Sequence, residues 1–600
     1  MNKNTILKAF SLPIVLSALL LGLAQCKKDE LDDPTEVNTV NITLNVGDNG
    51  SSRHTIDTIT GDVTFQNGDV IYVGDGSTYI GTLTRADNVF SGTINEPADN
   101  TEIYFYFVGG LTPSTTPSAG STSSFTVDIS NQSTKMPVLS CDQATYHTGT
   151  TSYSCVLQDQ CALVKFTTSS TVLPVHVGGL YTNALIDFEN NCITNNGTKG
   201  FIDLYKAEFT AQWAVLLPQS DFVDAEGVVG DIGYTISMPA IEAGAFLTGD
   251  AAISISSTPN HNRYLQWAAF DLTLDNNDIV TGTLDWPLKV SIADGATVTL
   301  DGVTINGTNN DDYSWAGITC LGDATIILKD GTTNTVKGFD EEYPGIQAAK
   351  RNGEGEEYTL TISGNGSLTV SSNGAGAGIG CALSSDCGNI TISSGTITAT
   401  SGGCGIGGCC GVSCGDITIS GGNITATGDA AGIGGDVWGG CGDITISGGE
   451  VTATGGEFEA GIGSGGMGVC GAITISGGTI TANGGKNAAG IGSGALGACG
   501  AITINGGTIM ATGGEGAGGI GSGCEGGCGT VTIDNTVTSV TATKGTGAPN
   551  SIGAGGSGEG SSSGTCGTVT IGGTVYWDGS AYQNGGDSYL ATSPLVYPAP

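Results

Sequence analysis

Residues 414–440 read CGDITISGGNITATGDAAGIGGDVWGG, and CGDITISGGEVTATGGEFEAGIGSG follows at once from residue 441. Both copies contain the unit Cys-Gly-x-Ile/Val-Thr-Ile, which occurs seven times with start-to-start distances of 27, 27, 29, 29, 29 and 38 residues. A repeat of this period, with several short β-like runs per unit, predicts a solenoid. The cysteines of the seven units are Cys387, Cys414, Cys441, Cys470, Cys499, Cys528 and Cys566.

Each repeat predicts one coil of the solenoid. In the first copy, alternation directs Ile417 and Ile419 inward in one run and Ile424 inward in the next. Glycines separate the runs, and Ile433 of a Gly-Ile marker then points inward. Three short strands per coil, stacked about 4.8 Å apart, predict a parallel β-helix over residues 271–575. The nine markers contain Ile318, Ile346, Ile379, Ile406, Ile433, Ile462, Ile491, Ile520 and Ile552.

The seven repeated cysteines stand near a corner of the coil. We expect them to form a buried ladder of small, polarizable side chains. Disulfides between coils are the alternative, because a Cα spacing near 4.8 Å lies inside the range that a disulfide accepts. A metal array has the weakest support, since neither histidine nor a close Cys-x-x-Cys pair accompanies the ladder. No metal is therefore predicted.

The N-terminus predicts export. Lys3 and Lys8 precede an apolar run that is too short for a convincing membrane-spanning helix, so residues 1–25 form a signal peptide. LAQC, which ends at Cys26, resembles the lipobox of bacterial lipoproteins, and KKDELDD after it resembles the acidic export tag of Bacteroidetes surface lipoproteins. These resemblances imply lipidation of Cys26 and a cell-surface position on the outer membrane, with residues 26–38 as an acidic tether.

Between the tether and the repeats, short runs rich in Val, Ile, Tyr and Phe predict two β-sandwich domains, over residues 39–135 and 136–270. The arrangement of GDVIYVGDGSTYIGTL, CALVKF and AVLLPQ resembles the fimbrillin-like lipoproteins of Bacteroidetes. That resemblance implies paired sandwiches used for pili or surface display, with fimbrial subunits as partners. Residues 576–600 are rich in aromatic side chains and are expected to cap the last coil.

The charged residues of the chain argue against nucleic-acid binding and against two kinds of polysaccharide cleavage. The chain has 600 residues and a formal net charge of −39, so nucleic acid is not an expected partner. The repeats lack histidine, and Lys486 is the only cation between Cys387 and Thr530, so neither polygalacturonase nor pectate-lyase chemistry is expected. Glu457, Lys486 and Glu515 recur every 29 residues and predict a charge ladder on the surface. No catalytic residues are assigned.

Two acidic clusters beside aromatic residues are candidates for sugar or calcium binding, because carboxylates and amides suit hydroxyl groups and this cation. A solvated loop at the mouth of the rod is the competing interpretation. A third candidate is the stacked pair Asp416 and Asp443, which could share a cation. The members of the two clusters are Asn309, Asn310, Asp311, Asp312, Tyr313 and Trp315, and then Asp340, Glu341 and Glu342.

The Gly-Ile-Gly and Gly-Gly-Thr-Ile-Thr-Ala-Thr units of residues 285–600 resemble the right-handed β-helix repeat proteins of gut bacteria, some of which are described as carbohydrate-binding. The expected function is a non-enzymatic surface adhesin or glycan-binding rod on a fimbrillin-like stalk, with a glycan or a host surface molecule as ligand. A polysaccharide lyase or hydrolase on the same rod is one alternative. A structural component of a pilus tip or of the envelope is the other.

Overall fold

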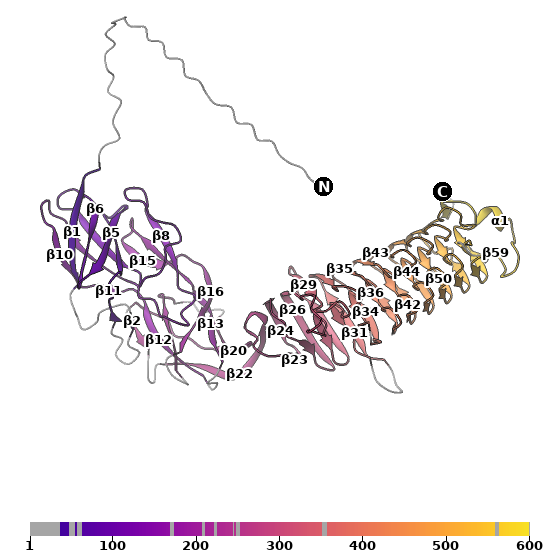
Figure 1. The fold of residues 1–600 in the computed structure, drawn as a ribbon, viewed down its shortest axis with the longest axis horizontal. Coiled ribbons are helices and arrows are strands. Elements are labelled where there is room, and N and C mark those ends of the chain that lie inside the picture. The colour runs from indigo at the N-terminus through magenta and orange to yellow at the C-terminus, as the bar shows by residue number, and fades with distance from the viewer. Residues whose placement is uncertain are drawn as a thin grey trace, which may run out of the picture.

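The computed structural model describes residues 37–46, 55–56, 63–168, 173–206, 211–220, 225–243, 245–247, 252–350, 357–383, 385–557 and 563–598. These residues are almost entirely β: N-terminal sheets lead into a parallel β-solenoid of about nine turns, which confirms the predicted fold class (Figure 1). Cys26 and the predicted signal peptide lie outside the described residues. Within the described part, no helix has the length and apolar character needed to cross a membrane.

The first sheet of the N-terminal region has eight strands, in the order β10-β1-β6-β5-β4-β7-β9-β11. Five of them are β4 (Val70–Gly74), β5 (Tyr79–Ala86), β7 (Glu102–Phe107), β9 (Ser140–Thr145) and β11 (Gln158–Asp159). Strand β1 (Thr39–Val46) pairs antiparallel with β6 (Val89–Asn95) and parallel with β10 (Ser152–Cys155). Conversely, β8 (Ser124–Asp128) pairs with β14 (Asn183–Asp187) in a separate three-stranded sheet. Strands thus pair across residue 135, the predicted boundary between the two sandwich domains. Strand β10 follows this residue but joins the first sheet, and β8 precedes it but pairs with β14.

The second half of this region is continuous with the solenoid. Strand β22 (Ile253–Tyr264) pairs antiparallel with β20 (Ile232–Ile236) and, at its end, parallel with β24 (Ile279–Leu284). Strand β24 in turn pairs parallel with β26 (Ala296–Ile305) of the next coil. One sheet thus runs from the N-terminal domains into the rod, and β22 covers the edge that the first coil would otherwise leave open.

A typical coil contains four short strands. They are β37 (Ser413–Cys414), β38 (Ile417–Ile419), β39 (Asn423–Gly428) and β40 (Ile433–Gly434). The inward residues predicted in β38, β39 and β40 are all fully buried. The strand at the cysteine was not predicted as an element, because only two residues per coil contribute to it and its pairing is visible only between coils.

The glycine of each Gly-Ile-Gly marker allows the coils to stack closely. Gly434 has φ 138°, and a Cβ atom there would lie 1.9 Å from the carbonyl oxygen of Gly463 in the next coil. The same relation continues from Gly463 to Gly492, at 1.8 Å. A side chain at these positions would force the coils apart.

The C-terminal end of the rod is closed by antiparallel strands. Strand β59 (Thr574–Trp577) pairs with β58 (Val569–Ile571), and β60 (Leu595–Tyr597) pairs with β55 (Ser539–Thr543). These pairings cover the edges of β55 and β58 in the last coils and so reduce the exposed strand edge that invites aggregation. The long sides of the rod remain available for binding.

Candidate functional site

A lateral groove of about 630 Å³ runs along the side of the later coils. It lies between two series of turns. The A turns precede the Gly-Ile strands and comprise residues 455–461, 484–490, 513–519 and 544–551. The B turns follow those strands and comprise residues 435–439, 464–468, 493–497 and 522–526. The groove is therefore built from segments of successive coils that stack on one another.

The A turns supply both polar and apolar side chains to the groove. Lys486 and Glu515, two members of the charge ladder predicted from the 29-residue spacing, line it together with Asn487. Phe458 also lines the groove, and 44% of its surface is exposed. A large exposed ring beside amide and charged groups is a combination that suits ligands with both apolar and hydroxyl surfaces.

The B turns carry an apolar crest that we did not predict. Trp438, Met467 and Leu496 occupy the same turn position in successive coils, and their exposed fractions are 66%, 46% and 56%. The indole Nε1 of Trp438 donates a hydrogen bond to Sδ of Met467 at 3.3 Å. Leu496 lines the lateral groove, whereas Trp438 and Met467 line a second cavity of about 420 Å³ on the other side of the crest. The 29-residue spacing of these three residues was the sequence signal that could have revealed them.

Two buried acids lie within these turns. Glu459 is 3% exposed, and its Oε2 accepts a hydrogen bond from the amide of Gly466 at 2.7 Å, which ties an A turn to a B turn. Asp436 is 7% exposed and accepts a hydrogen bond from the amide of Val437 at 2.5 Å. Burial raises the pKa of Glu459 to about 7 and that of Asp436 to about 6. Both acids brace the turns, since their carboxyl groups bond to backbone amides.

The two predicted ligand clusters lie side by side in neighbouring coils nearer the N-terminus. The amide of Asn310 donates a hydrogen bond to the carbonyl oxygen of Phe339 at 3.1 Å. The amide of Phe339 donates one to the carbonyl oxygen of Trp315 at 3.2 Å. Asp340 is buried, and its Oδ1 accepts a hydrogen bond from the amide of Glu342 at 2.8 Å. The indole Nε1 of Trp315 is buried and has no partner within the described ranges. The remaining cluster residues are exposed or half-buried, namely Asn309, Asp311, Asp312, Tyr313 and Glu341.

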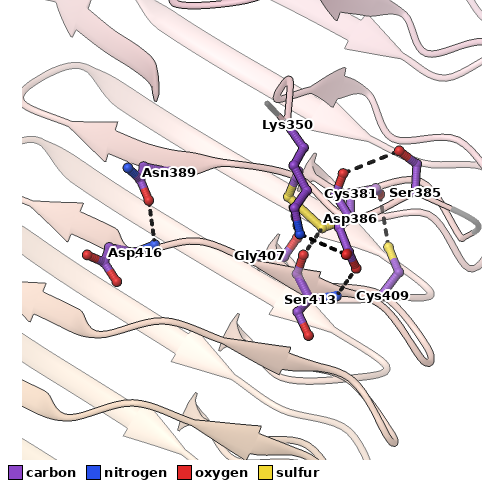
Figure 2. Close-up of a disulfide and its surroundings, with 10 residues drawn as sticks. Lys350, Cys381, Ser385, Asp386, Asn389, Gly407, Cys409, Ser413 and Asp416 are labelled. Carbon is purple, nitrogen blue, oxygen red and sulfur yellow. Dashed lines mark hydrogen bonds and ion pairs between the residues drawn. A yellow bond between two sulfur atoms is a disulfide. The ribbon is translucent and has the colours of Figure 1, made fainter. Parts of the chain in front are cut away.

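The stacked acids Asp416 and Asp443 connect coils. The amide of Asp416 donates to Oδ1 of Asn389 at 2.8 Å (Figure 2). The amide of Asp443 donates to Oδ1 of Asp416 at 2.8 Å, and the amide of Ala472 donates to Oδ1 of Asp443 at 2.7 Å. Each side chain thus accepts a backbone hydrogen bond from the next coil. Nowhere in the described part of the chain do three or more potential metal ligands gather into a site.

The cysteine ladder is present in register from Cys414 to Cys566. Cys414 pairs with Cys441, and the same pairing continues through Cys470, Cys499, Cys528 and Cys566. These six cysteines are free, and the first four are buried. Hydrogen bonding to the neighbouring thiol, together with burial, raises the pKa of Cys441, Cys499 and Cys528.

The remaining predicted member of the ladder, and the first in the chain, is bonded within its own coil. Cys387 forms a disulfide with Cys381, six residues earlier (Figure 2). Beside it, Asp386 forms an ion pair with Lys350 at 2.8 Å and accepts a hydrogen bond from the amide of Ser413, also at 2.8 Å. The upstream end of the ladder is therefore closed by a covalent bond within its own coil.

Comparison with known proteins agrees with this fold. The beta helix repeat family matches residues 360–383, 390–411, 417–440, 444–466, 473–495 and 502–524. No curated protein gives a significant match. Among solved structures, a candidate cell adhesion protein from Bacteroides uniformis has 14% identity and a TM-score of 0.26, with 38% of this chain and 99% of that one covered. A fimbrial assembly protein from Parabacteroides distasonis has 11% identity and a TM-score of 0.21, with 34% and 85% covered. Likenesses of this size assign no function.

Proposed function

We propose that this protein is a non-enzymatic adhesin of the bacterial cell surface, in which a lipid-anchored N-terminal region displays a glycan-binding β-solenoid. The observation that carries the proposal is the lateral groove, where exposed Phe458 and Leu496 lie beside Lys486, Asn487 and Glu515. Sugar rings have apolar C–H faces and hydroxyl rims, so a site for them needs both kinds of side chain. The groove volume of about 630 Å³ is within the range of small-molecule and oligosaccharide sites.

The route of the chain supports a display role. The sheet that contains β22 continues into the first coil, and further strands pair with this sheet at the two ends of the rod. A ligand therefore meets the sides of the solenoid, away from the N-terminal attachment. The N-terminal sheets act as the stalk and as the contact for fimbrial subunits in this proposal.

One observation favours a hydrolase as the second candidate: Glu515 and Glu525 both line the groove. A glycosidase needs two carboxyl groups on opposite sides of the scissile bond. The full chain, purified in detergent, should bind at least one member of a panel of soluble polysaccharides. Incubation with that polysaccharide should produce no new reducing ends and no unsaturated products. Cleavage that is lost in Glu515→Gln or Glu525→Gln, but kept in the exposed control Glu450→Gln, would instead establish the hydrolase. Retention of no polysaccharide would favour a structural envelope component.

The anchor is tested separately. Cys26→Ser should release the protein from the membrane fraction, since a thioether-linked lipid requires the thiol of Cys26. Fatty-acid labelling that persists in Cys26→Ser would refute lipidation at this residue. Replacing Asp29, Glu30, Asp32 and Asp33 by Asn or Gln should preserve labelling but reduce cleavage by protease added to intact cells. Unchanged cleavage would count against the acidic export tag.

A further inference from the structure

We propose that the crest of Trp438, Met467 and Leu496 is a stacking track for an extended, uncharged glycan strand that lies parallel to the solenoid axis, with one sugar ring per coil. This inference rests on the proposed function and specifies the class and orientation of its ligand. Four observations carry it: the backbone conformation of the crest, its exposure, its spacing and the charge around it.

The crest residues occupy a backbone conformation that large side chains rarely adopt. Their φ angles are 54°, 55° and 57°, in the left-handed region that favours glycine. The corresponding turn of the preceding coil has Gly411, with φ 71°. Non-glycine residues in this region are strained, and such strain is concentrated at functional sites. Three successive coils thus carry a bulky apolar residue where glycine would fit without strain, and Glu525 has the same conformation in the next coil, with φ 55°.

The crest side chains do not gain enough burial within the protein to offset the strain of their backbone. Roughly half or more of each crest side chain is exposed, and Val469 beside Met467 in the second cavity is 61% exposed. Contiguous exposed apolar surface of this kind marks an interaction site. With Phe458 across the lateral groove, the crest offers apolar surface on both of its sides.

The spacing of the crest indicates an extended glycan. Gly440 pairs in parallel register with Val469, and Val469 with Ala498, so successive B turns repeat at the coil spacing of about 4.8 Å. One ring of an extended pyranose chain advances by a similar length. A glycan that runs along the axis can therefore place consecutive apolar ring faces over consecutive crest residues, while its hydroxyl groups reach Asn487 and Glu515 in the groove.

The charge of the chain selects against acidic ligands and against a second copy of the chain. The net charge is −39, and Glu515 and Glu525 line the groove beside a single cation, Lys486. A polyanion would be repelled by this surface, and another molecule of the same chain would bring an equal negative charge. A neutral polysaccharide meets neither obstacle.

The test is calorimetric titration of the full chain in detergent with β-1,4-linked glucan, mannan and xylan oligosaccharides of one to six sugars, and with oligogalacturonate as the acidic comparison. We expect binding of at least one neutral series, with affinity that rises with each sugar up to three or four. Trp438→Ala and the triple variant Trp438→Gly/Met467→Gly/Leu496→Gly should weaken that binding about tenfold or more, a loss of about 1.4 kcal/mol or more. The exposed control Met510→Ala, which lies outside the crest, should retain it.

The outcomes separate the two proposals. Melting temperatures should not fall in the triple glycine variant, because glycine relieves the strained φ angles. If a neutral oligosaccharide binds the parent and Trp438→Ala equally well, the track is wrong and the adhesin proposal stands. A preference for oligogalacturonate also overturns the track alone. If none of these oligosaccharides binds the parent, the track is wrong, and the adhesin proposal then falls only if no member of the polysaccharide panel binds either.

Discussion

The guanidinium group of Arg263, in the last N-terminal strand, lies 3.0 Å from the carboxylate of Asp278, in the turn before β24. Arg263 also pairs with Asp231 at 2.5 Å, and its side chain is only 12% exposed. Close by, Trp267 stacks on His176 with ring centroids 3.9 Å apart. The junction between the N-terminal region and the solenoid is therefore held by buried polar and aromatic contacts in addition to strand pairing.

Asp278→Asn should loosen this junction. The substitution removes one charged partner from Arg263 at a site where Asp278 is 5% exposed, and we expect a loss of about 2 kcal/mol. Limited proteolysis should then cut near the junction faster than in the parent. Asp275→Asn, at an exposed neighbouring position, is the matched control. Equal cleavage rates for the two variants would contradict a stabilising role for the Arg263–Asp278 pair.

Glu459 should make stability depend on pH. Its pKa is about 7 in the folded protein, against about 4.3 in an unfolded chain, so the folded state binds the proton more tightly. The contribution of Glu459 to the free energy of unfolding should thus be greatest below about pH 4 and should fall as the pH rises through 7. Asp436, with a pKa of about 6, adds a decline in the same direction.

Denaturant unfolding of the parent and of Glu459→Gln at several pH values measures this effect. At pH 8 the variant should be more stable than the parent by up to about 3 kcal/mol, and near pH 4 the two should agree. Glu457→Gln, two residues away and exposed, should keep the pH dependence of the parent. Equal stability of the parent and Glu459→Gln at pH 8, as well as near pH 4, would show that Glu459 ionises without penalty.

The cysteine ladder should behave as packing rather than as a set of cross-links. Cys470→Ala removes a small buried side chain and should cost about 1–2 kcal/mol. In the folded protein, Cys441 and Cys499 should resist alkylation, because both thiols are buried. Mass spectrometry of unfolded, unreduced protein should find most ladder thiols free. Six paired ladder cysteines would establish disulfides between coils instead.

The close stacking of the coils can be tested at two glycines. Gly463→Ala should destabilise the solenoid by about 3 kcal/mol or more, because the new Cβ would meet the carbonyl oxygen of Gly492 at 1.8 Å. Gly411→Ala also changes a residue with positive φ, but its Cβ would meet nothing within 4 Å. This control should cost only about 1–2 kcal/mol. Comparable melting temperatures for the two variants would mean that close contact between coils is not the reason why the marker position requires glycine.

Much of the solenoid could be predicted from the sequence because its determinants are local and repeated. Alternation places Ile417 and Ile419 inward, and a constant repeat length aligns Ile417 with Ile444 of the next coil. A sheet whose strands come from successive copies of one repeat needs no further information on pairing order. The strand pairing of the N-terminal sheets could not be predicted in this way. Strand β1 pairs with β10, more than 100 residues later, and no sequence repeat indicates that pairing.

The sequence by itself therefore determined the parallel β-helix, the inward faces of its strands and the register of the cysteines from Cys414 onward. Only the tertiary structure decided that Cys387 bonds to Cys381, that Glu459 ties an A turn to a B turn, and that the two turn series enclose a groove beside the Trp438 crest. The physical reason is that hydrophobic periodicity specifies which side of a strand is buried. It does not specify how a closed coil brings its different turns together in space.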